Sequence, residues 1–249
     1  MIKNVLIILS SAVAIGVKQC NNMDSTLTLD WVKSDSEVIQ RIPPNQEGRD
    51  KNTLYLPPRK IQDSEFNTPQ LYGFINHMYD LMVAKSGVGI AANQVGKRLQ
   101  IFIIEAKANN PRYKVLGPVA KQIFINPKII RASSSKKNFW HGCLSANGEK
   151  RGNVATYEWI EYECQNIKGE IQRGKLEGFA AVIFQHEFRH MLNGTYLDVA
   201  KQFLSKPELD QQIELGKLPF FETASDSLPH LIGEYVIGES MDEFHARKK

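Results

Sequence analysis

Two histidines and a glutamate stand together in the string QHEFRH, residues 185–190. His186 and His190 are four residues apart, so on a helix both imidazoles project from one face and can reach a single metal ion. Glu187 follows the first histidine, where its carboxylate can accept and deliver protons beside that ion. The spacing matches the H-E-x-x-H pattern of metal-dependent hydrolases. Apolar residues surround the triplet, and polar groups in a buried helix need partners, which an ion supplies.

Two histidines do not complete such a site, because a catalytic zinc-type ion usually has three protein ligands. Downstream of the motif the chain offers Glu208, Glu214 and His230, none of them in a recognisable ligand pattern. Upstream, Cys143 lies in the string HGCLS, but a single cysteine in apolar surroundings is more often a small packing residue than a ligand. The residue types alone therefore leave the third ligand open.

Two helices are expected to frame this chemistry. Residues 178–192, which carry the motif, are apolar at Phe179, Val182, Ile183 and Phe184, and this pattern predicts a buried helix. Residues 68–85 repeat apolar side chains at helical spacing and therefore predict a second helix. Its boundaries are Thr68 as N-cap, Pro69 at the first helical position, Ser86 and Gly87 at the end, with Gly87 expected in the left-handed cap geometry.

Between these helices the chain alternates β-rich runs with turn residues. The predicted strands are residues 99–105, 122–126, 129–132, 157–165 and 170–173. Pro127 is expected to stop the second of them, and a turn at residues 166–169 is expected to pair the last two as a hairpin. The order helix, strands, buried helix indicates an α+β domain rather than alternating βαβ units.

The composition limits the number of domains and the classes of partner to expect. A chain of 249 residues with 42% hydrophobic residues can bury one sizeable core, which suggests one catalytic domain with tails. The formal net charge of +4 comes from Lys and Arg residues spread along the chain, so a nucleic-acid partner is not indicated. The three cysteines, Cys20, Cys143 and Cys164, are too few and odd in number for a disulfide framework.

The N-terminus bears on the compartment. Residues 4–17 form an apolar run typical of a signal-peptide core and shorter than the ~20 residues of a membrane-spanning helix. Cys20 follows as an acylated cysteine would, yet residues 17–19 are poor for lipoprotein processing. Export, membrane anchoring and an uncleaved leader therefore all remain open. Residues 21–53 are polar and indicate an arm or linker.

Three separated segments together resemble the signature motifs of the peptide deformylase family: GVGIAANQVG at 87–96, HGCLS at 141–145 and QHEFRH at 185–190. The similarity extends from about residue 54 to residue 198 and includes FINPKI at 124–129. It implies an α+β fold in which antiparallel and mixed sheets pack around a central buried metal-binding helix. The implied division of the chain is a leader over 1–20, a polar arm over 21–53, a catalytic domain over 54–200 and a divergent C-terminal segment over 201–249.

The resemblance assigns roles at the reaction centre residue by residue. Cys143 corresponds to the third metal ligand beside His186 and His190, and Glu187 corresponds to the general acid and base. The Gln94 side chain and the backbone N–H of Leu144 correspond to the groups that stabilise the oxyanion.

The resemblance also places the substrate. The backbone of Gly89 corresponds to the glycine that pairs with the substrate chain, and an apolar pocket would take its first residue. The positions matching that pocket and its rim are Val88, Phe139, His141, Phe179 and Ile183.

The implied reaction is hydrolysis of the N-formyl group of formylmethionyl peptides and nascent proteins, with release of formate. A thiolate and two imidazoles suit Fe(II), the ion common in the family, and also accept Zn, Ni or Co. The implied partners are a formylated nascent chain and the ribosome that carries it, in a bacterial cytoplasm. Membrane contact through residues 4–17 remains an open expectation.

Five positions depart from the family pattern. His141 and Arg189 each replace a usual acid, and Thr156 replaces a usual arginine. Asn93 replaces a usual proline, and Gly194 comes one residue later than the usual glycine. The retained ligands and Glu187 predict an active but atypical enzyme, and the changed surroundings could lower its activity, because changes around metal ligands often cost about 10 to 100-fold in metal affinity or activity. Two alternatives follow: a zinc peptidase that rests on HEFRH alone, and a binding module that retains formyl peptides without turnover.

Overall fold

The computed structural model describes residues 37–108, 116–146, 150–216 and 222–249. The predicted leader over residues 1–20 and the arm up to residue 36 lie outside the described residues. In the described part, no helix has the length and apolar character needed to cross a membrane.

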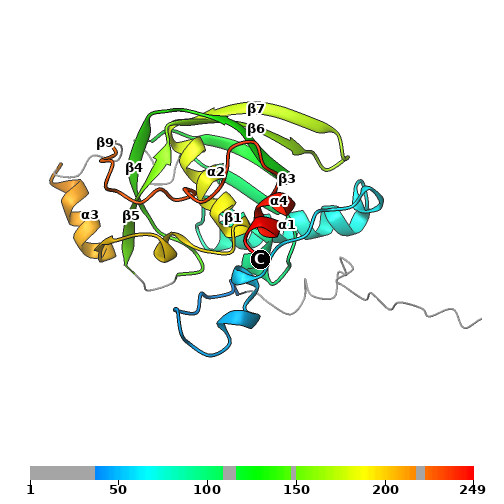
Figure 1. Cartoon of the computed structure of the whole chain (residues 1–249), viewed down its shortest axis with the longest axis horizontal. Helices are drawn as coiled ribbons and strands as arrows, with labels where there is room; N and C mark the ends of the chain where they lie inside the picture. The colour runs from blue at the N-terminus through cyan, green and yellow to red at the C-terminus, as the bar shows by residue number, and fades with distance from the viewer. Residues whose placement is uncertain (1–36, 109–115, 147–149, 217–221) are drawn as a thin grey trace, which may run out of the picture.

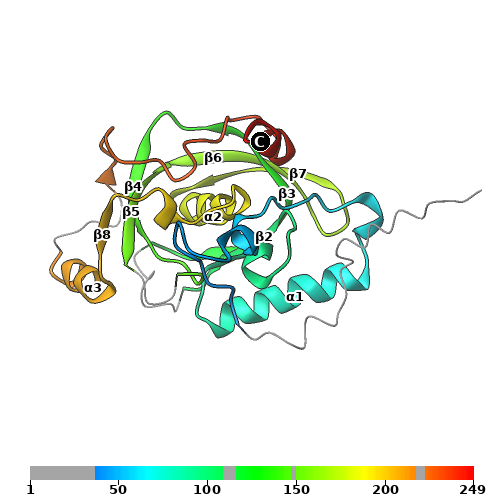
Figure 2. The ribbon, with the colours of Figure 1, turned by 60° about the horizontal axis from the view of Figure 1, so that its bottom comes forward.

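Two antiparallel sheets surround the helix that carries the HEFRH string (Figures 1 and 2). That helix is α2, Gly178–Met191, as the apolar pattern of residues 178–192 predicts. One sheet has the order β1 (Gly89–Ala91), β2 (Ile101–Ala106), β3 (Val119–Ala132), β6 (Trp159–Gln165), β7 (Ile171–Glu177). The other has the order β8 (Gln202–Leu204), β5 (Arg151–Tyr157), β4 (Lys136–His141), β9 (Glu222–Thr223). The α+β prediction, with sheets around a central helix, is confirmed.

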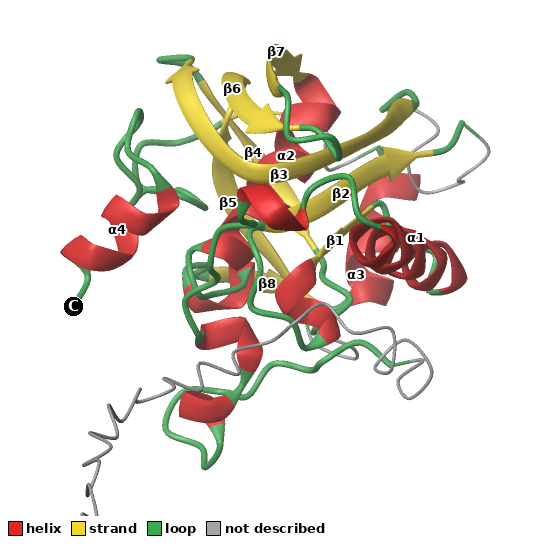
Figure 3. Cartoon of the chain, turned by 90° about the vertical axis from the view of Figure 1, so that its right-hand side faces the viewer, coloured by secondary structure: helices red, strands yellow, loops and turns green. Residues whose placement is uncertain are grey.

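The β2 strand separates two apolar cores because its side chains alternate between its faces. Phe102 and Ile104 join the cluster around α2, whereas Ile101 and Ile103 join a second cluster. The second cluster is completed by α1, Pro69–Ala84, which lies outside the larger sheet (Figure 3). The neighbouring strand β1, which carries the first motif, is divided in the same way, because Ala91 joins the cluster around α2 and Ile90 joins the second cluster.

Phe184 anchors α2 in its cluster. Its ring meets those of Phe102 and Phe124 edge to face, at centroid distances of 5.0 and 4.9 Å, a geometry favoured by aromatic quadrupoles. Phe184 is fully buried, so the rotation of the helix about its axis is set by packing.

The limits of α1 match the prediction at its start and differ at its end. The Thr68 side chain accepts the N–H of Leu71, as an N-cap does. At the other end Ser86, not Gly87, takes the left-handed conformation, with φ of 55°. Gly87 instead donates its N–H to Met82 at 2.8 Å, the six-to-one bond of a Schellman motif.

The two strands predicted on either side of Pro127 are one strand, β3, so the prediction of a stop was wrong. The pairing of β3 with β6 shifts register between Ile125 and Lys128. Asn126 bulges there with φ of 51°, and its side chain exchanges hydrogen bonds with the backbone of Ile61. A bulge accepts proline because the local ladder bond is already absent.

The hairpin prediction is confirmed by β6 and β7, which pair antiparallel from Trp159 with Glu177 to Gln165 with Ile171. The strands β4, β5, β8 and β9 and the helices α3 (Lys206–Glu214) and α4 (Met241–Arg247) were not predicted. Both helices lie in the C-terminal segment.

Residues 37–53, predicted as part of a polar arm, pack against the motif segments in the structure. Val38 is buried, and the N–H of Ile39 donates to the carbonyl of Gln94 at 2.8 Å. The N–H of Arg41 donates to the carbonyl of Ser145, also at 2.8 Å. This stretch therefore ties the first motif to the second.

Candidate metal centre

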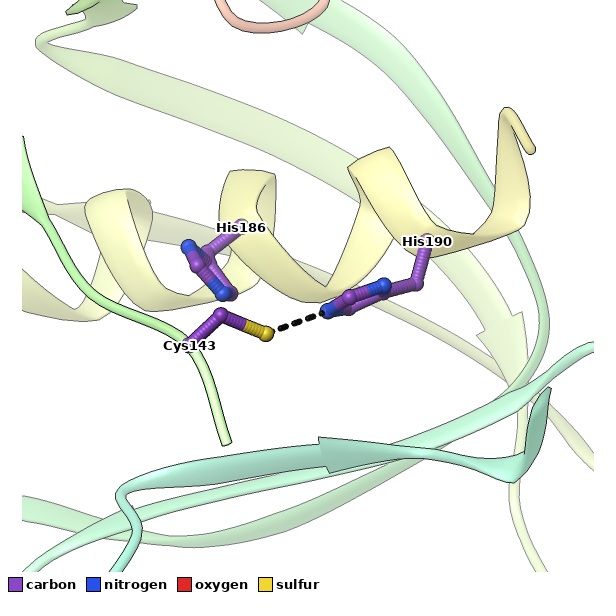
Figure 4. Close-up of side chains that lie close together, drawn as sticks. All are labelled: Cys143, His186 and His190. Carbon is purple, nitrogen blue, oxygen red and sulfur yellow. Dashed lines mark hydrogen bonds between the residues drawn. The ribbon is translucent and has the colours of Figure 1, made fainter. Parts of the chain in front are cut away.

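The HEFRH helix and the HGCLS loop meet in the middle of the fold. His186 and His190 project from α2, and Cys143 lies just after β4 (Figure 4). One ligand atom of each residue lies within 4.8 Å of the others, which is a spacing that one ion can bridge. Among the described residues this is the group of His, Cys, Asp or Glu side chains that could hold a metal ion.

Three polar groups lie within hydrogen-bonding distance of the Cys143 sulfur. His190 Nε2 lies 3.3 Å from Sγ, and the backbone N–H of Ser145 donates to it at 3.4 Å (Figure 4 shows the His190 contact). The Gln94 side chain donates from Nε2 at 3.5 Å. Burial, followed by the nearby charge of Glu187, raises the pKa of the Cys143 thiol to about 12. A bound cation would reverse this, because coordination displaces the thiol proton.

The imidazoles of this group are held neutral. Burial, followed by the Arg151 charge, lowers the pKa of His186 to about 4. Burial also lowers the pKa of His190 well below its ordinary value, with smaller contributions from His186 and Arg189. A neutral imidazole has the lone pair that metal coordination needs.

Glu187 lies against the first motif. Its carboxylate rests against Gly89, where an added side-chain carbon would come 2.2 Å from Oε1. Oε2 is buried and has no hydrogen-bond partner among the described residues. Burial raises the pKa of Glu187 well above its ordinary value, so the carboxylate is a better proton acceptor than an exposed glutamate.

Gln94 is held by the turn in which it lies. Ala92–Val95 form a 3-10 turn after β1, and Gln94 Oε1 accepts the N–H of Ala91 at 2.8 Å. Nε2 donates to the hydroxyl of Ser145 at 3.1 Å, which leaves the amide beside the HGCLS loop. The Leu144 side chain lies over Gly87, where an added carbon would come 2.8 Å from Cδ1.

Aromatic residues of β4 and α2 meet beside His186. The ring of Phe139 lies 5.7 Å from that of Phe179 and 5.2 Å from that of His141. His141 Nδ1 lies 3.0 Å from His186 Nδ1. Phe179 and Ile183 are buried, and Val88 and Phe139 are partly buried against the same cluster. Of the positions that the resemblance assigns to a pocket, Phe139, His141 and Phe179 are thus neighbours, and Val88 and Ile183 belong to the same apolar cluster.

Asn93 and Ser145 also support the site, and the sequence did not point to them. Asn93 Nδ2 donates to the carbonyl of His190 at 2.8 Å. Ser145 contacts both Gln94 and Cys143. The sequence signal for both residues was a polar side chain inside a motif string. In the structure both side chains are fully buried, and buried polar groups need hydrogen-bond partners.

Of the downstream alternatives for the third ligand, none joins the group. Glu208 and Glu214 lie on α3, and the Glu208 carboxylate caps that helix at Ser205. The His230 ring packs at a tilt against that of Tyr157, with ring centroids 4.3 Å apart. Two residues that depart from the family pattern have partners elsewhere. Thr156 donates to the carbonyl of Lys137 at 3.3 Å, and Arg189 forms an ion pair with Glu234.

Known proteins resemble this chain in sequence. The family model described as polypeptide deformylase matches residues 49–206. Peptide deformylase 1 of Bordetella pertussis is 36% identical over 131 residues, covering 53% of this chain and 73% of that protein. The peptide deformylase of Aquifex aeolicus is 31% identical over 148 residues, covering 59% and 83%.

Solved structures agree with the sequence relatives. The class I type b peptide deformylase from Acinetobacter baumannii, in its Met-Ala-Ser-bound crystal structure, superposes with a TM-score of 0.58 at 28% identity. That match covers 66% of this chain and 99% of the other. The matches favour deformylation over the zinc-peptidase alternative. The chain belongs to the polypeptide deformylase family, a family of metal-dependent hydrolases that remove the N-formyl group from formylmethionyl peptides.

Proposed function

We propose that Cys143, His186 and His190 hold the catalytic ion of this deformylase and that Glu187 is its general acid and base. The observation that carries the proposal is the convergence of the three ligand atoms within 4.8 Å at the centre of the fold. The donor set fits a divalent ion, since it combines one sulfur with two neutral imidazoles. The unpartnered Glu187 Oε2 also fits, because a buried carboxylate oxygen needs a donor such as water.

Fe(II) is the ion that we propose, with Zn, Ni or Co as substitutes. The sulfur ligand favours the softer transition metals over Mg or Ca. When bound, the ion supplies the positive charge that acidifies water and polarises the formyl carbonyl.

Glu187 accepts the proton of the attacking water and then delivers it to the amine that leaves. Its buried setting against Gly89 raises its pKa, which suits a group that must both take and give a proton near neutral pH. The oxygen of the water first bonds to the formyl carbon, which places negative charge on the former carbonyl oxygen. The C–N bond then breaks as the amine takes the proton, so the products are formate and a free amino terminus.

Gln94 Nε2 and the backbone N–H of Leu144 stabilise the charge that develops on the former carbonyl oxygen. Gln94 is pre-positioned by Ala91 and Ser145, so little reorganisation is needed at the moment of reaction. Donors fixed in this way lower the barrier more than mobile ones.

The peptide substrate extends along β1. Within the described residues β1 is an edge strand of its sheet, so the backbone of Gly89 can pair with an extended chain. The apolar residues assigned to the pocket receive the methionine side chain. The relative that carries Met-Ala-Ser supports this substrate class. The residues assigned to the pocket are Val88, Phe139, His141, Phe179 and Ile183.

A nascent chain leaving the ribosome, in the cytoplasm of a bacterium, is the proposed source of substrate, because the matched relatives include peptide deformylases of bacteria. Export or membrane contact through residues 4–17 remains a prediction of the sequence. Mass spectrometry of the mature N-terminus distinguishes a retained leader from a processed one.

The ion assignment is tested by metal analysis of protein purified without oxygen. We expect about one iron per chain in the parent and loss of most of it in Cys143→Ala and His190→Ala. A parent level of iron in either variant would contradict the ligand set. The Cys164→Ala variant is the matched control, because Cys164 is buried in the sheet away from the group.

A further inference from the structure

Arg189 places a buried positive charge on the metal-binding helix. It lies on α2 between Glu187 and His190, and its side chain is 8% exposed. Nη1 donates to Oε1 of Glu234, while Nε has no hydrogen-bond partner among the described residues. The carboxylate of Glu234 is therefore the anion that accompanies this guanidinium.

The C-terminal segment brings that carboxylate to the helix. Ala155 of β5 bridges to His230, and Leu231 donates its N–H to the carbonyl of Ala155 at 2.8 Å. Further along, the ring of Tyr235 meets that of Phe188 edge to face at 4.9 Å. Glu234 is thus fixed between two anchored residues.

Residues of α4 and just after it also contact α2 and Glu234. His245 Nε2 lies 2.8 Å from the carbonyl of Met191, at the end of α2. Lys248 Nζ lies 2.9 Å from Oε2 of Glu234, the oxygen that Arg189 Nη1 does not contact. Gly194 makes room for the guanidinium, because a side-chain carbon there would come 2.6 Å from Nη2.

The ion pair of Arg189 and Glu234 bears on the net charge next to the proposed ion site. An unpaired guanidinium in a buried position keeps its full charge and is poorly screened by water. Arg189 is the neighbour of His190 in sequence and lies three residues, less than one helical turn, after His186 on α2. A dication held by these two imidazoles would be repelled by a guanidinium at this position whose charge is not neutralised.

We infer that Glu234 is a positioning residue of the metal centre, which neutralises Arg189 and thereby lets the C-terminal segment set the affinity for the ion. The inference rests on the proposed ion site at Cys143, His186 and His190. It makes Glu234 part of the site's charge balance, although Glu234 is not one of the three proposed ligands.

Co(II) binding tests the proposed ion site and the role of Glu234 separately. The parent is titrated with Co(II) without oxygen, and the thiolate charge-transfer band reports occupancy. Loss of the band in Cys143→Ser tests the site. Glu234→Gln is expected to weaken Co(II) binding about tenfold with an unchanged band shape. Glu239→Gln is the matched control, because Glu239 contacts Arg247 and not Arg189, and it should stay within about twofold.

Rescue separates charge balance from mere packing. The pair of changes Arg189→Met and Glu234→Gln removes both charges and should restore Co(II) affinity to within about threefold of the parent, since a neutral apolar pair needs no compensation. Parental affinity in Glu234→Gln, or a double variant no better than the single one, would overturn the inference.

Two further outcomes remain decisive. If Glu234→Gln does not fold, Arg189→Met alone carries the test: it should bind Co(II) at least as tightly as the parent, and a tenfold loss would overturn the inference. A parent without a thiolate band would overturn the ion site itself, and the inference with it.

Discussion

The carboxylate of Glu187 occupies the space that a side chain at position 89 would fill. A carbon added to Gly89 would come 2.2 Å from Oε1 and 2.7 Å from Cδ of Glu187. The first motif and the metal-binding helix are therefore matched in shape at this point. The absence of a side chain at Gly89 allows the acid/base group to approach the strand along which we place the substrate.

Gly89→Ala should displace Glu187 and lower kcat by about 100-fold, because an error of about 1 Å in a catalytic group can cost that much. Metal content should stay at the parent level, since the three atoms nearest to a carbon added at Gly89 all belong to Glu187 and none to a proposed ligand. Steady-state kinetics and metal analysis check this. If the effect acts through Glu187, adding Gly89→Ala to Glu187→Ala should cost little more; an additive loss would refute that route.

Gln94→Leu should lower kcat by about 100 to 1000-fold with a small change in KM, because a donor fixed in advance acts mainly on the transition state. Ser145→Ala is the matched comparison, since it removes the hydroxyl that Gln94 contacts at 3.1 Å and leaves the amide in place. Its loss should be smaller. A change confined to KM in Gln94→Leu would exclude a role in stabilising the oxyanion.

Acid should destabilise the protein partly through His230. Burial, followed by the Lys136 charge, lowers the pKa of His230 to about 4, and Nδ1 accepts the N–H of Ile232 at 3.2 Å. An unfolded histidine has a pKa of about 6.5, so between these values the unfolded chain binds a proton that the folded chain does not. The free energy of unfolding should therefore fall as the pH drops from about 6.5 towards 4. Urea unfolding at several pH values should show a shallower fall in His230→Gln, and parallel curves would disprove the assignment.

Asn126→Ala should lower the free energy of unfolding by about 1–3 kcal/mol, since the backbone groups of Ile61 lose their partner. Asn126→Gly loses the same hydrogen bonds but accepts the φ of 51° without strain, so it should cost about 1 kcal/mol less than the alanine variant. Thermal unfolding of the two variants side by side provides the measurement. Equal melting temperatures would show that the left-handed backbone carries no cost.

Strong periodicity explains which elements could be predicted. The helices over residues 68–85 and 178–192 show apolar side chains at helical spacing, and the structure has α1 and α2 there. The β4 strand reads KKNFWH and shows no alternation of apolar and polar residues, so nothing in its own sequence signalled a strand; its pairing with β5 and β9 is visible only in the fold. Pro127 signalled a strand end, yet the bulge at Asn126 depends on Ile61, which no local pattern reveals.

The site residues likewise divide into those that local spacing predicts and those that it does not. His186, Glu187 and His190 follow from their own spacing, whereas Cys143 required the family resemblance, because a lone cysteine carries no spacing. The departure at Arg189 suggested a lost charge pair. Its partner, Glu234, lies 45 residues further along the chain, and only the fold of the C-terminal segment brings the two together.

Release of formate from formyl-Met-Ala-Ser tests the central claim most directly. Purified protein is loaded with Fe(II) or Ni(II) without oxygen and compared with Glu187→Ala of equal metal content. We predict turnover in the parent and a loss of about 100 to 10,000-fold in the variant, the range that general acid/base groups supply. Formate release by the parent no greater than that of Glu187→Ala, with the ion bound in both, would contradict the account.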